Sequence, residues 1–400
     1  MKSRRALAGA GSVLVVGALI AGCSGSSIAS DASASAAASV SSAASGPAAS
    51  ASPSADVQAA FQKVLDDAKA KFDFPGAQAG VWTADGQWYG VTGTSAPNGD
   101  RPPQRDDHTR IGSITKTFTV ATLLQLVDQG KVSLDDPISK YFPEIPNGDT
   151  ATLRMLASMT SGIPPYSFNE DFQKAYFSDP NTVFRPQQLV DYIKKTPASF
   201  PAGTKVEYSN TNTVLLGMVI EQVTGKPFAE VLKAGILDPL GLTETSFPGD
   251  SNALPTPHLD GITEQTDPDG EVKNATDFNP SWGFTSGAMI STLDDLHAWS
   301  VALGTGDGWV SPVLQKERMA SMTSSVEGNT PQMAYALGFG VANGWIGHTG
   351  ELPGYNTSIT YDPATGTSIV VMVNSDIPSD SKNPAPYISA QLQEALVAAK

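Results

Sequence analysis

The sequence has little cysteine, little histidine and no hydrophobic run of membrane-spanning length. Cys23 is its single cysteine, so no disulfide can form within one molecule. The longest apolar stretch runs from about residue 6 to 21, which is shorter than the roughly 20 residues that a spanning helix needs. The four histidines are His108, His258, His297 and His348. None has a paired metal-ligand spacing, which argues against a metalloenzyme, and we expect no metal and no cofactor.

Basic residues are also scarce, because 25 Lys and Arg stand against 40 Asp and Glu, for a formal net charge of −15. An acidic chain without a basic cluster is a poor ligand for nucleic acid or for anionic lipid. We therefore expect no nucleic-acid partner.

The N-terminus has the pattern of an export signal. Three basic residues among the first five precede the apolar stretch, and Ile20-Ala21-Gly22-Cys23 follows, which resembles a bacterial lipobox. In such signals the peptidase cleaves before the cysteine, whose thiol carries lipid. The alternative is an ordinary secretory peptide with an incidental cysteine. We predict a signal peptide over 1–22, lipidation of Cys23, and anchoring to the outer face of the bacterial cell membrane.

Residues 24 to about 55 are nearly all Ser and Ala, with too little apolar bulk to offset the entropy of ordering. We predict a flexible tether over 23–55, which as a coil would span on the order of 30 Å. The remaining domain, 56–400, has about 340 residues, enough for a large core or two subdomains.

Within this domain the hydrophobic pattern predicts strands at both ends and helices between them. A hairpin is expected at Asp85-Gly86, and a helix buried on most sides over 113–129. The remaining principal elements are terminal helices over 55–71 and 387–399, and strands over 337–341, 354–361 and 367–373. The expected fold class is α+β, with an antiparallel sheet made from N- and C-terminal strands, flanked by helices, and a mostly helical subdomain inserted. An active site would lie at the seam between the two parts.

Ser113 and Lys116 are three residues apart and would share one face of the buried helix. A serine at a helix start has free N–H groups beside it, which stabilise the oxyanion that forms when a carbonyl is attacked. The lysine could accept the serine proton or hold a neighbouring phenol ionised. The plain structural alternative is a helix N-cap serine followed by a solvated lysine.

Tyr208-Ser209-Asn210 precedes another predicted helix, over 213–224. Tyr208 could act as a base only if its pKa fell from about 10 toward 7, and Lys116 and His348 are candidate cations for that. Asn210 could bridge Lys116 and a substrate carbonyl. A buried tyrosine and a helix-capping asparagine are the structural alternatives.

His348-Thr349-Gly350 begins a strand-rich end of the chain. Gly350 would let a ligand approach a strand edge closely, and His348 could donate to the phenol. If protonation of His348 matters, activity should change between about pH 5.5 and 7.5. The alternative is a turn histidine with no part in catalysis.

Taken together, three motifs carry a resemblance: Thr109 to Lys116, Tyr208-Ser209-Asn210 and Gly347-His348-Thr349-Gly350. They resemble the class C β-lactamase and D-Ala-D-Ala carboxypeptidase superfamily, as do Met159 to Ile163 and Ser286 to Thr292. The resemblance covers about residues 57–395 and implies the β-lactamase/transpeptidase-like fold.

The resemblance also implies roles. Ser113 would be the acylated nucleophile, Lys116 and Tyr208 the proton-handling pair, and Asn210 an anchor for substrate and for Lys116. His348 and Thr349 would support the tyrosine and the far end of the substrate. Gly350, Glu351 and Trp282 would line the cleft, and the N–H groups of Ser113 and Glu351 would form the oxyanion hole.

Two features depart from the carboxypeptidases of this superfamily, which hold a substrate carboxylate with a hydroxyl and an arginine. Glu351 stands where the hydroxyl is expected, and residues 336–347 include no Lys or Arg. A carboxylate would meet a like charge instead of a bidentate partner. Leu352-Pro353-Gly354 resembles esterase-like members.

The sequence therefore predicts a monomeric serine hydrolase that works through an acyl-enzyme. Its substrates would be small esters or amides, or D-Ala-D-Ala-type peptides such as the peptidoglycan stem peptide. The alternatives are a true β-lactamase and a non-catalytic penicillin- or peptidoglycan-binding lipoprotein of the same fold.

Overall fold

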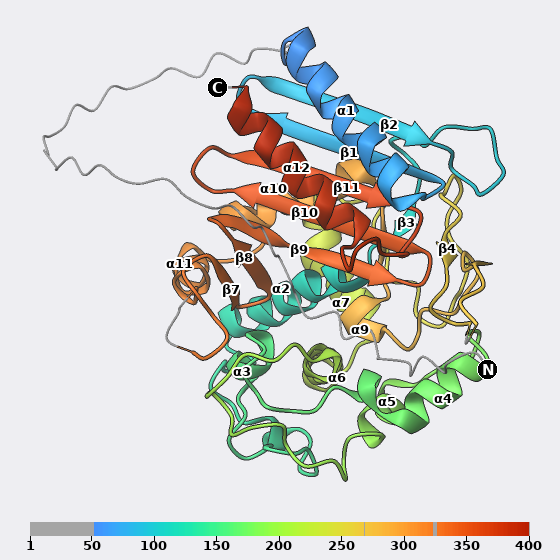
Figure 1. The fold of residues 1–400 in the computed structure, drawn as a ribbon. Helices are drawn as coiled ribbons and strands as arrows, with labels where there is room; N and C mark the ends of the chain where they lie inside the picture. Colours follow the sequence, from blue (N-terminus) through green and yellow to red (C-terminus); the bar gives the residue numbers. More distant parts are fainter. Residues whose placement is uncertain (1–51, 268, 323–325, 400) are drawn as a thin grey trace, which may run out of the picture.

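A computed structural model describes residues 52–399 of the chain, apart from 268 and 323–325. Its centre is a seven-stranded sheet in the order β2-β1-β11-β10-β9-β8-β7, with every neighbouring pair antiparallel (Figure 1). The strands are β1 (Gly76–Thr83), β2 (Gly86–Gly93), β7 (Met333–Ala336), β8 (Phe339–Ala342), β9 (Trp345–Leu352), β10 (Tyr355–Asp362) and β11 (Thr367–Val373). Because β1 pairs with β11, the two ends of the domain build one sheet, which confirms the predicted fold class.

Two helices from opposite ends of the chain cover one face of this sheet. Figure 1 shows α1 (Ala55–Phe72) and α12 (Pro384–Ala398) lying side by side across the strands, and they pack against one another. The helix α10 (Leu293–Thr305) packs on the opposite face. All of β11 is buried, and its side chains alternate between two cores, as the period of a strand requires. This double burial explains the unbroken apolar run from Ile369 to Val373 in β11.

The regular elements of the chain between β2 and β7 are mostly helices, as expected for the inserted part, and long loops join them. Its helices are α2 (Thr115–Asp128), α3 (Leu153–Ala157), α4 (Glu170–Ser178), α5 (Pro186–Asp191), α6 (Asn210–Thr224), α7 (Phe228–Leu232), α8 (Asp238–Leu240), α9 (Phe284–Gly287), α10 and α11 (Pro312–Ala320). Short 3-10 turns are η1 (Gly112–Ile114), η2 (Ile138–Lys140) and η3 (Tyr166–Phe168), and one π turn is η4 (Lys233–Leu237). Two small antiparallel ladders pair β3 (Thr109–Arg110) with β6 (Ile290–Ser291) and β4 (Ile262–Thr263) with β5 (Lys273–Asn274).

The helix α2 connects the insertion to the sheet by packing. Ten consecutive residues from Thr115 to Leu124 are buried, so α2 has no solvent-facing stripe along that length. It packs against α6 and α9, and η1 at its start packs against β9. The predicted helix over 113–129 is therefore present, but its first turn is the separate 3-10 turn η1.

Sequence reasoning misplaced one strand and missed several short elements. The predicted strand over 337–341 is interrupted at Gly338, whose φ of +77° belongs to the turn between β7 and β8.

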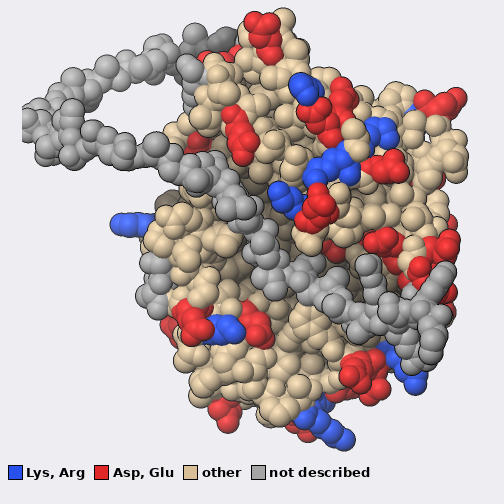
Figure 2. Space-filling view, viewed as in Figure 1, with Lys and Arg blue, Asp and Glu red and all other residues tan. Residues whose placement is uncertain are grey.

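None of the helices in the described part of the chain is long and apolar enough to span a bilayer. Figure 2 shows acidic and basic side chains interspersed over the visible face, with no continuous basic patch on it.

Candidate active site

Ser113 lies in the turn η1, where the start of α2 meets the sheet. Gly112 has a φ of +51°, and a Cβ atom there would lie 2.4 Å from the backbone nitrogen of Glu351. A Cβ atom at Gly350 would lie 1.9 Å from the carbonyl oxygen of Ile111. Both glycines thus allow backbone-to-backbone contact between η1 and β9, which brings the Glu351 N–H beside the serine turn.

Lys116 follows one turn later and is completely buried. Its Nζ lies 3.0 Å from Ser113 Oγ and donates to the carbonyl oxygen of Ser286 at 2.7 Å. Burial lowers the pKa of Lys116 well below its ordinary value of 10.5. Burial therefore favours the neutral form of this amine, and a neutral amine can accept the serine proton.

Tyr208 reaches the same point from the loop before α6. Nζ of Lys116 lies 4.7 Å from the centre of its ring, and the Ser113 side chain is near enough to lower the pKa of its hydroxyl. Burial raises the pKa of Tyr208, and the hydrogen bond to Ser113 offsets this only in part. Burial of Tyr208 thus works against the lowered pKa that this tyrosine would need to act as a base.

Asn210 begins α6, and its side-chain amide donates to Ser167 Oγ at 3.4 Å. Lys116 is anchored instead by the carbonyl oxygen of Ser286, from a segment that the sequence resemblance had singled out. The expected Lys116–Asn210 bridge is thus replaced, among the described residues, by a main-chain acceptor.

His348 lies within β9 and is buried. Its Nδ1 contacts the carbonyl oxygen of Thr349, which can only accept, so Nδ1 carries the proton. Its Nε2 lies 3.1 Å from the hydroxyl of Tyr335 and must accept from it. Burial is the main cause that lowers the pKa of His348 to about 3. The structure therefore contradicts the expectation of a protonatable His348 that donates to Tyr208.

Tyr335, in β7, is the site residue that sequence reasoning missed. Its ring meets Tyr208 nearly edge-on, with centroids 6.1 Å apart, and meets His348 likewise at 5.7 Å. A single tyrosine in a four-residue strand belongs to no motif. Only the pairing of β7 with β8 and of β8 with β9 shows that it reaches the site.

The side chain of Glu351 is engaged away from the serine turn. Its carboxylate accepts hydrogen bonds from the amides of Gln265 and Asn383, at 2.9 and 2.5 Å. It also raises the pKa of the neighbouring buried carboxyl of Asp376, although burial of Asp376 is the larger cause. What Glu351 offers to the site is therefore its main-chain N–H. Thr349, the other polar residue of this strand segment, is partly exposed.

Trp282 belongs to an aromatic cluster of the insertion. Its ring packs against Tyr176 and Phe172, with centroids 5.2 and 6.2 Å away, and its carbonyl oxygen accepts from the hydroxyl of Tyr166. It does not appear among the described residues that line the cavity beside the site. Trp282 thus packs within the insertion, and its place in the cleft stays a prediction.

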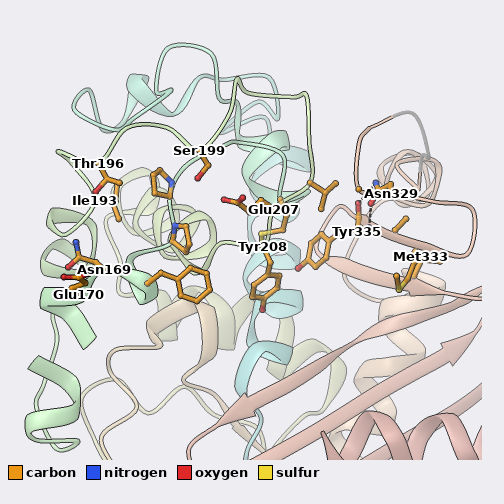
Figure 3. Close-up of a pocket in the computed structure, with 18 residues that line it drawn as sticks. Asn169, Glu170, Ile193, Thr196, Ser199, Glu207, Tyr208, Asn329, Met333 and Tyr335 are labelled. Atoms are coloured by element: carbon orange, nitrogen blue, oxygen red, sulfur yellow. Dashed lines mark hydrogen bonds between the residues drawn. The ribbon is translucent and has the colours of Figure 1, made fainter. Parts of the chain in front are cut away.

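That cavity has a volume of about 760 Å³ and opens beside Tyr208 and Tyr335. Figure 3 shows the two tyrosines on its floor, with the hydroxyl of Tyr335 directed toward Tyr208. Its walls come from the loop around Pro164, from the segment before Tyr208, and from β7 and β8. No cluster of three or more potential metal ligands occurs in the part of the chain that the structure describes.

This arrangement of serine, buried lysine and tyrosine in a sheet-and-insertion fold defines a class of protein. Residues 61–393 match the family model described as Beta-lactamase. The chain belongs to this family of serine hydrolases and has its fold.

Particular relatives narrow the comparison. A D-stereospecific amidohydrolase from Streptomyces sp. is 31% identical, with a TM-score of 0.73 over 84% of this chain and 98% of that one. A D-amino acid amidase from Ochrobactrum anthropi SV3, solved with L-phenylalanine amide, is 25% identical, with a TM-score of 0.73 over 86% of this chain and 99% of that one. Protein flp of Staphylococcus aureus (strain N315) is 29% identical over 329 residues, which are 80% of this chain. The match spans only 63% of that relative's own length.

Proposed function

We propose that this protein is a serine amidase and esterase that cleaves small amides and esters through an acyl-enzyme on Ser113. The observation that carries the proposal is the buried amine of Lys116, 3.0 Å from Ser113 Oγ. A serine hydroxyl is a weak nucleophile unless a base takes its proton. The amine of Lys116, whose pKa burial lowers, is the base that we favour over Tyr208, whose pKa burial raises.

The chemistry follows from these contacts. Ser113 Oγ attacks the substrate carbonyl while its proton passes to Lys116, and the N–H groups of Ser113 and Glu351 bind the oxyanion. When the bond to the leaving group breaks, the Lys116–Tyr208 pair supplies one proton to the departing nitrogen or oxygen. Water then attacks the ester, and the same pair takes a proton from water and returns one to Ser113.

D-Aminoacyl amides are the substrates that we favour, ahead of D-Ala-D-Ala peptides and β-lactams. The Streptomyces relative, at 31% identity, is a D-stereospecific amidohydrolase. Carboxypeptidases of this superfamily hold the substrate carboxylate with an arginine. Here the residue that faces both Tyr208 and His348 is the neutral Tyr335. A peptide's terminal carboxylate would lack a bidentate partner there.

The test is a side-by-side assay of D-phenylalaninamide, p-nitrophenyl acetate, a D-Ala-D-Ala peptide and nitrocefin, with mass spectrometry of the trapped protein. We expect turnover of the first two and an acyl mass increase on Ser113. Ser113→Ala should abolish both, whereas Ser178→Ala, at an exposed serine of α4, should abolish neither. Exclusive turnover of the peptide would contradict the substrate assignment, and acylation without turnover would indicate a binding protein.

We further propose that the protein is exported and held at the outer face of the membrane by lipid on Cys23. The support is the sequence alone, since Cys23 and most of the proposed tether lie outside the described residues. The monomeric state stays a prediction.

A further inference from the structure

The cavity beside the site has an unusual combination of walls. Apolar side chains supply most of its surface, among them Met159, Pro164, Phe168 and Met333. Phe168 is 54% exposed, so a large aromatic group stands in contact with solvent at this cavity. Such exposed apolar surface in a concave site is typical of a ligand-binding surface.

The charged residues of the cavity all have one sign. Glu170, at the start of α4, and Glu207, next to Tyr208, line it, and Figure 3 shows both beside the same space. Its described lining residues include no Lys, Arg or His. The polar remainder comprises neutral groups such as Ser199, Thr196 and the hydroxyl of Tyr335.

The position of Tyr208 decides which part of a substrate this cavity receives. Nζ of Lys116 lies 3.0 Å from Ser113 Oγ and 4.7 Å from the centre of the Tyr208 ring, and Tyr208 forms part of the cavity wall. The group that protonates a leaving atom must lie next to that atom. The oxyanion side is different, because β9 and Gly112 close it by backbone contact. A substrate bonded at Ser113 therefore directs its leaving group along Tyr208 into the cavity.

We propose that this cavity is a leaving-group pocket that selects apolar, carboxylate-free amines and alcohols. This inference rests on the proposed function and adds the identity of the group released. The apolar walls favour binding of an alkyl or aryl leaving group. Glu170 and Glu207 repel a carboxylate, and no Lys, Arg or His among the described lining residues offsets this repulsion. At roughly 10 Å and an effective dielectric constant of about 20, one such repulsion amounts to about a tenfold change in rate.

Two substrates that differ only in this property provide the test. D-Alanyl-2-phenylethylamide and D-alanyl-D-phenylalanine share the acyl group and the phenylethyl skeleton, and the second adds a carboxylate next to the scissile nitrogen. We expect kcat/KM to be at least about tenfold higher for the first. Equal rates, or a preference for the carboxylate, would overturn the inference.

Variants of the wall make the test specific. Met333→Arg places a cation in the cavity and should move the ratio of the two rates toward the carboxylate substrate by about tenfold. The matched control is Val313→Arg, which adds the same charge on α11 at a side chain that is 80% exposed and outside the cavity. Should Met333→Arg fold poorly, Glu207→Gln removes one repulsion and should shift the ratio in the same direction. An unchanged ratio in Glu207→Gln and in any folded Met333→Arg protein contradicts the pocket's role.

A second pair of variants tests the apolar wall. Phe168→Ser should lower kcat/KM for the phenylethylamide relative to D-alaninamide by about tenfold, because D-alaninamide releases only ammonia. Phe177→Ser, at another exposed phenylalanine that is not in the cavity wall, should leave this ratio unchanged. D-Alaninamide also separates the two proposals. If D-alaninamide is not turned over and Ser113 is not acylated, the proposed function is refuted. If D-alaninamide is turned over but the phenylethylamide and D-alanyl-D-phenylalanine react at equal rates, only the proposed role of the cavity is refuted.

Discussion

At the scale of single residues, the chemistry of this site is set by burial more than by pairing of charges. Burial lowers the pKa of Lys116, and no carboxylate contributes to this shift. Burial thus favours the neutral form of the amine beside Ser113, without a carboxylate partner. The same burial keeps Tyr208 protonated, so one environment produces both a proton acceptor and a proton donor.

A buried polar amine should also cost stability, which gives the first prediction. Lys116→Met keeps the length of the side chain and removes the group that must be desolvated. We expect the variant to lose hydrolysis while its free energy of unfolding rises by about 1–3 kcal/mol. Urea denaturation and turnover of D-phenylalaninamide measure the two effects. A variant that is both inactive and less stable would show that Lys116 supports the fold.

Wild-type activity should depend on pH through the same amine. The active form of Lys116 is deprotonated, so kcat/KM should rise with pH through a limb that lies well below 10.5. The pH profile of kcat/KM, measured with a neutral amide, locates that limb. A limb near the ordinary pKa of lysine would contradict a buried, neutral base.

His348 gives a second prediction about pH: activity should not depend on its protonation. Its pKa of about 3 means that the imidazole stays neutral from pH 5.5 to 7.5, so no limb of the activity profile should belong to it. NMR of labelled His348 should show one Nδ1–H tautomer across that range and titration near 6.5 only in denaturant. Because the folded pKa is lowered, the unfolded chain binds the proton first. Stability should therefore fall as pH drops from about 6.5 toward 3, by up to about 1.4 kcal/mol per pH unit from this group.

The residue-level site was only partly predictable. The spacing of Ser113 and Lys116 and the motif at Tyr208 led to three residues that the structure brings together. The directions of the pKa shifts could not be predicted, because they depend on how completely the fold excludes water. Tyr335 could not be predicted either, since strand pairing and not sequence spacing places it against His348.

At the scale of elements, the contact between β9 and η1 holds the site together. It joins residues more than two hundred positions apart through backbone atoms, and glycine is what permits it at Gly112 and Gly350. A side chain at either position would push β9, and with it the Glu351 N–H, away from the serine.

Gly112→Ala is the prediction that tests this contact. The added Cβ meets the Glu351 backbone, so we expect about 1–3 kcal/mol of destabilisation and about 100-fold lower kcat/KM. The matched control is Gly130→Ala at the end of α2, where φ is also positive, at +67°, but nothing lies within 4 Å of the new atom. It should lose stability through backbone strain and keep its activity. Equal losses of activity in the two variants would mean that strain and not displacement of β9 is responsible.

Long elements were predictable from the sequence, and short ones were not. The terminal helices, the helix α2 and strands β10 and β11 have enough residues for a period or an apolar run to emerge. The elements α7, α8 and α9 and the two-residue strands are too short to carry a period. Neighbouring segments define them, through packing that only the assembled fold reveals.

At the scale of the whole molecule, the return of the C-terminal strands onto the N-terminal hairpin creates the seam in which the site lies. The order of segments along the chain, strands, then helices, then strands, was sufficient to predict this architecture. The cavity was not predictable, because its walls come from three separate stretches, around residues 159–170, 193–208 and 328–341. Their approach depends on how the insertion rests on the edge of the sheet.

Residues 1–51 precede the described domain, whose first helix, α1, packs against α12. If that segment serves only as an anchor and a tether, Cys23→Ser in the full chain should move activity from the membrane fraction to the soluble fraction, with kcat/KM unchanged. Ser26→Ala, in the tether, should leave the distribution as it was. Fractionation of the host cells with an amide assay, and mass spectrometry of the mature N-terminus, measure both. Retention at the membrane of a Cys23→Ser protein from which residues 1–22 have been removed would contradict lipid anchoring, whereas an uncleaved signal would keep its own apolar stretch.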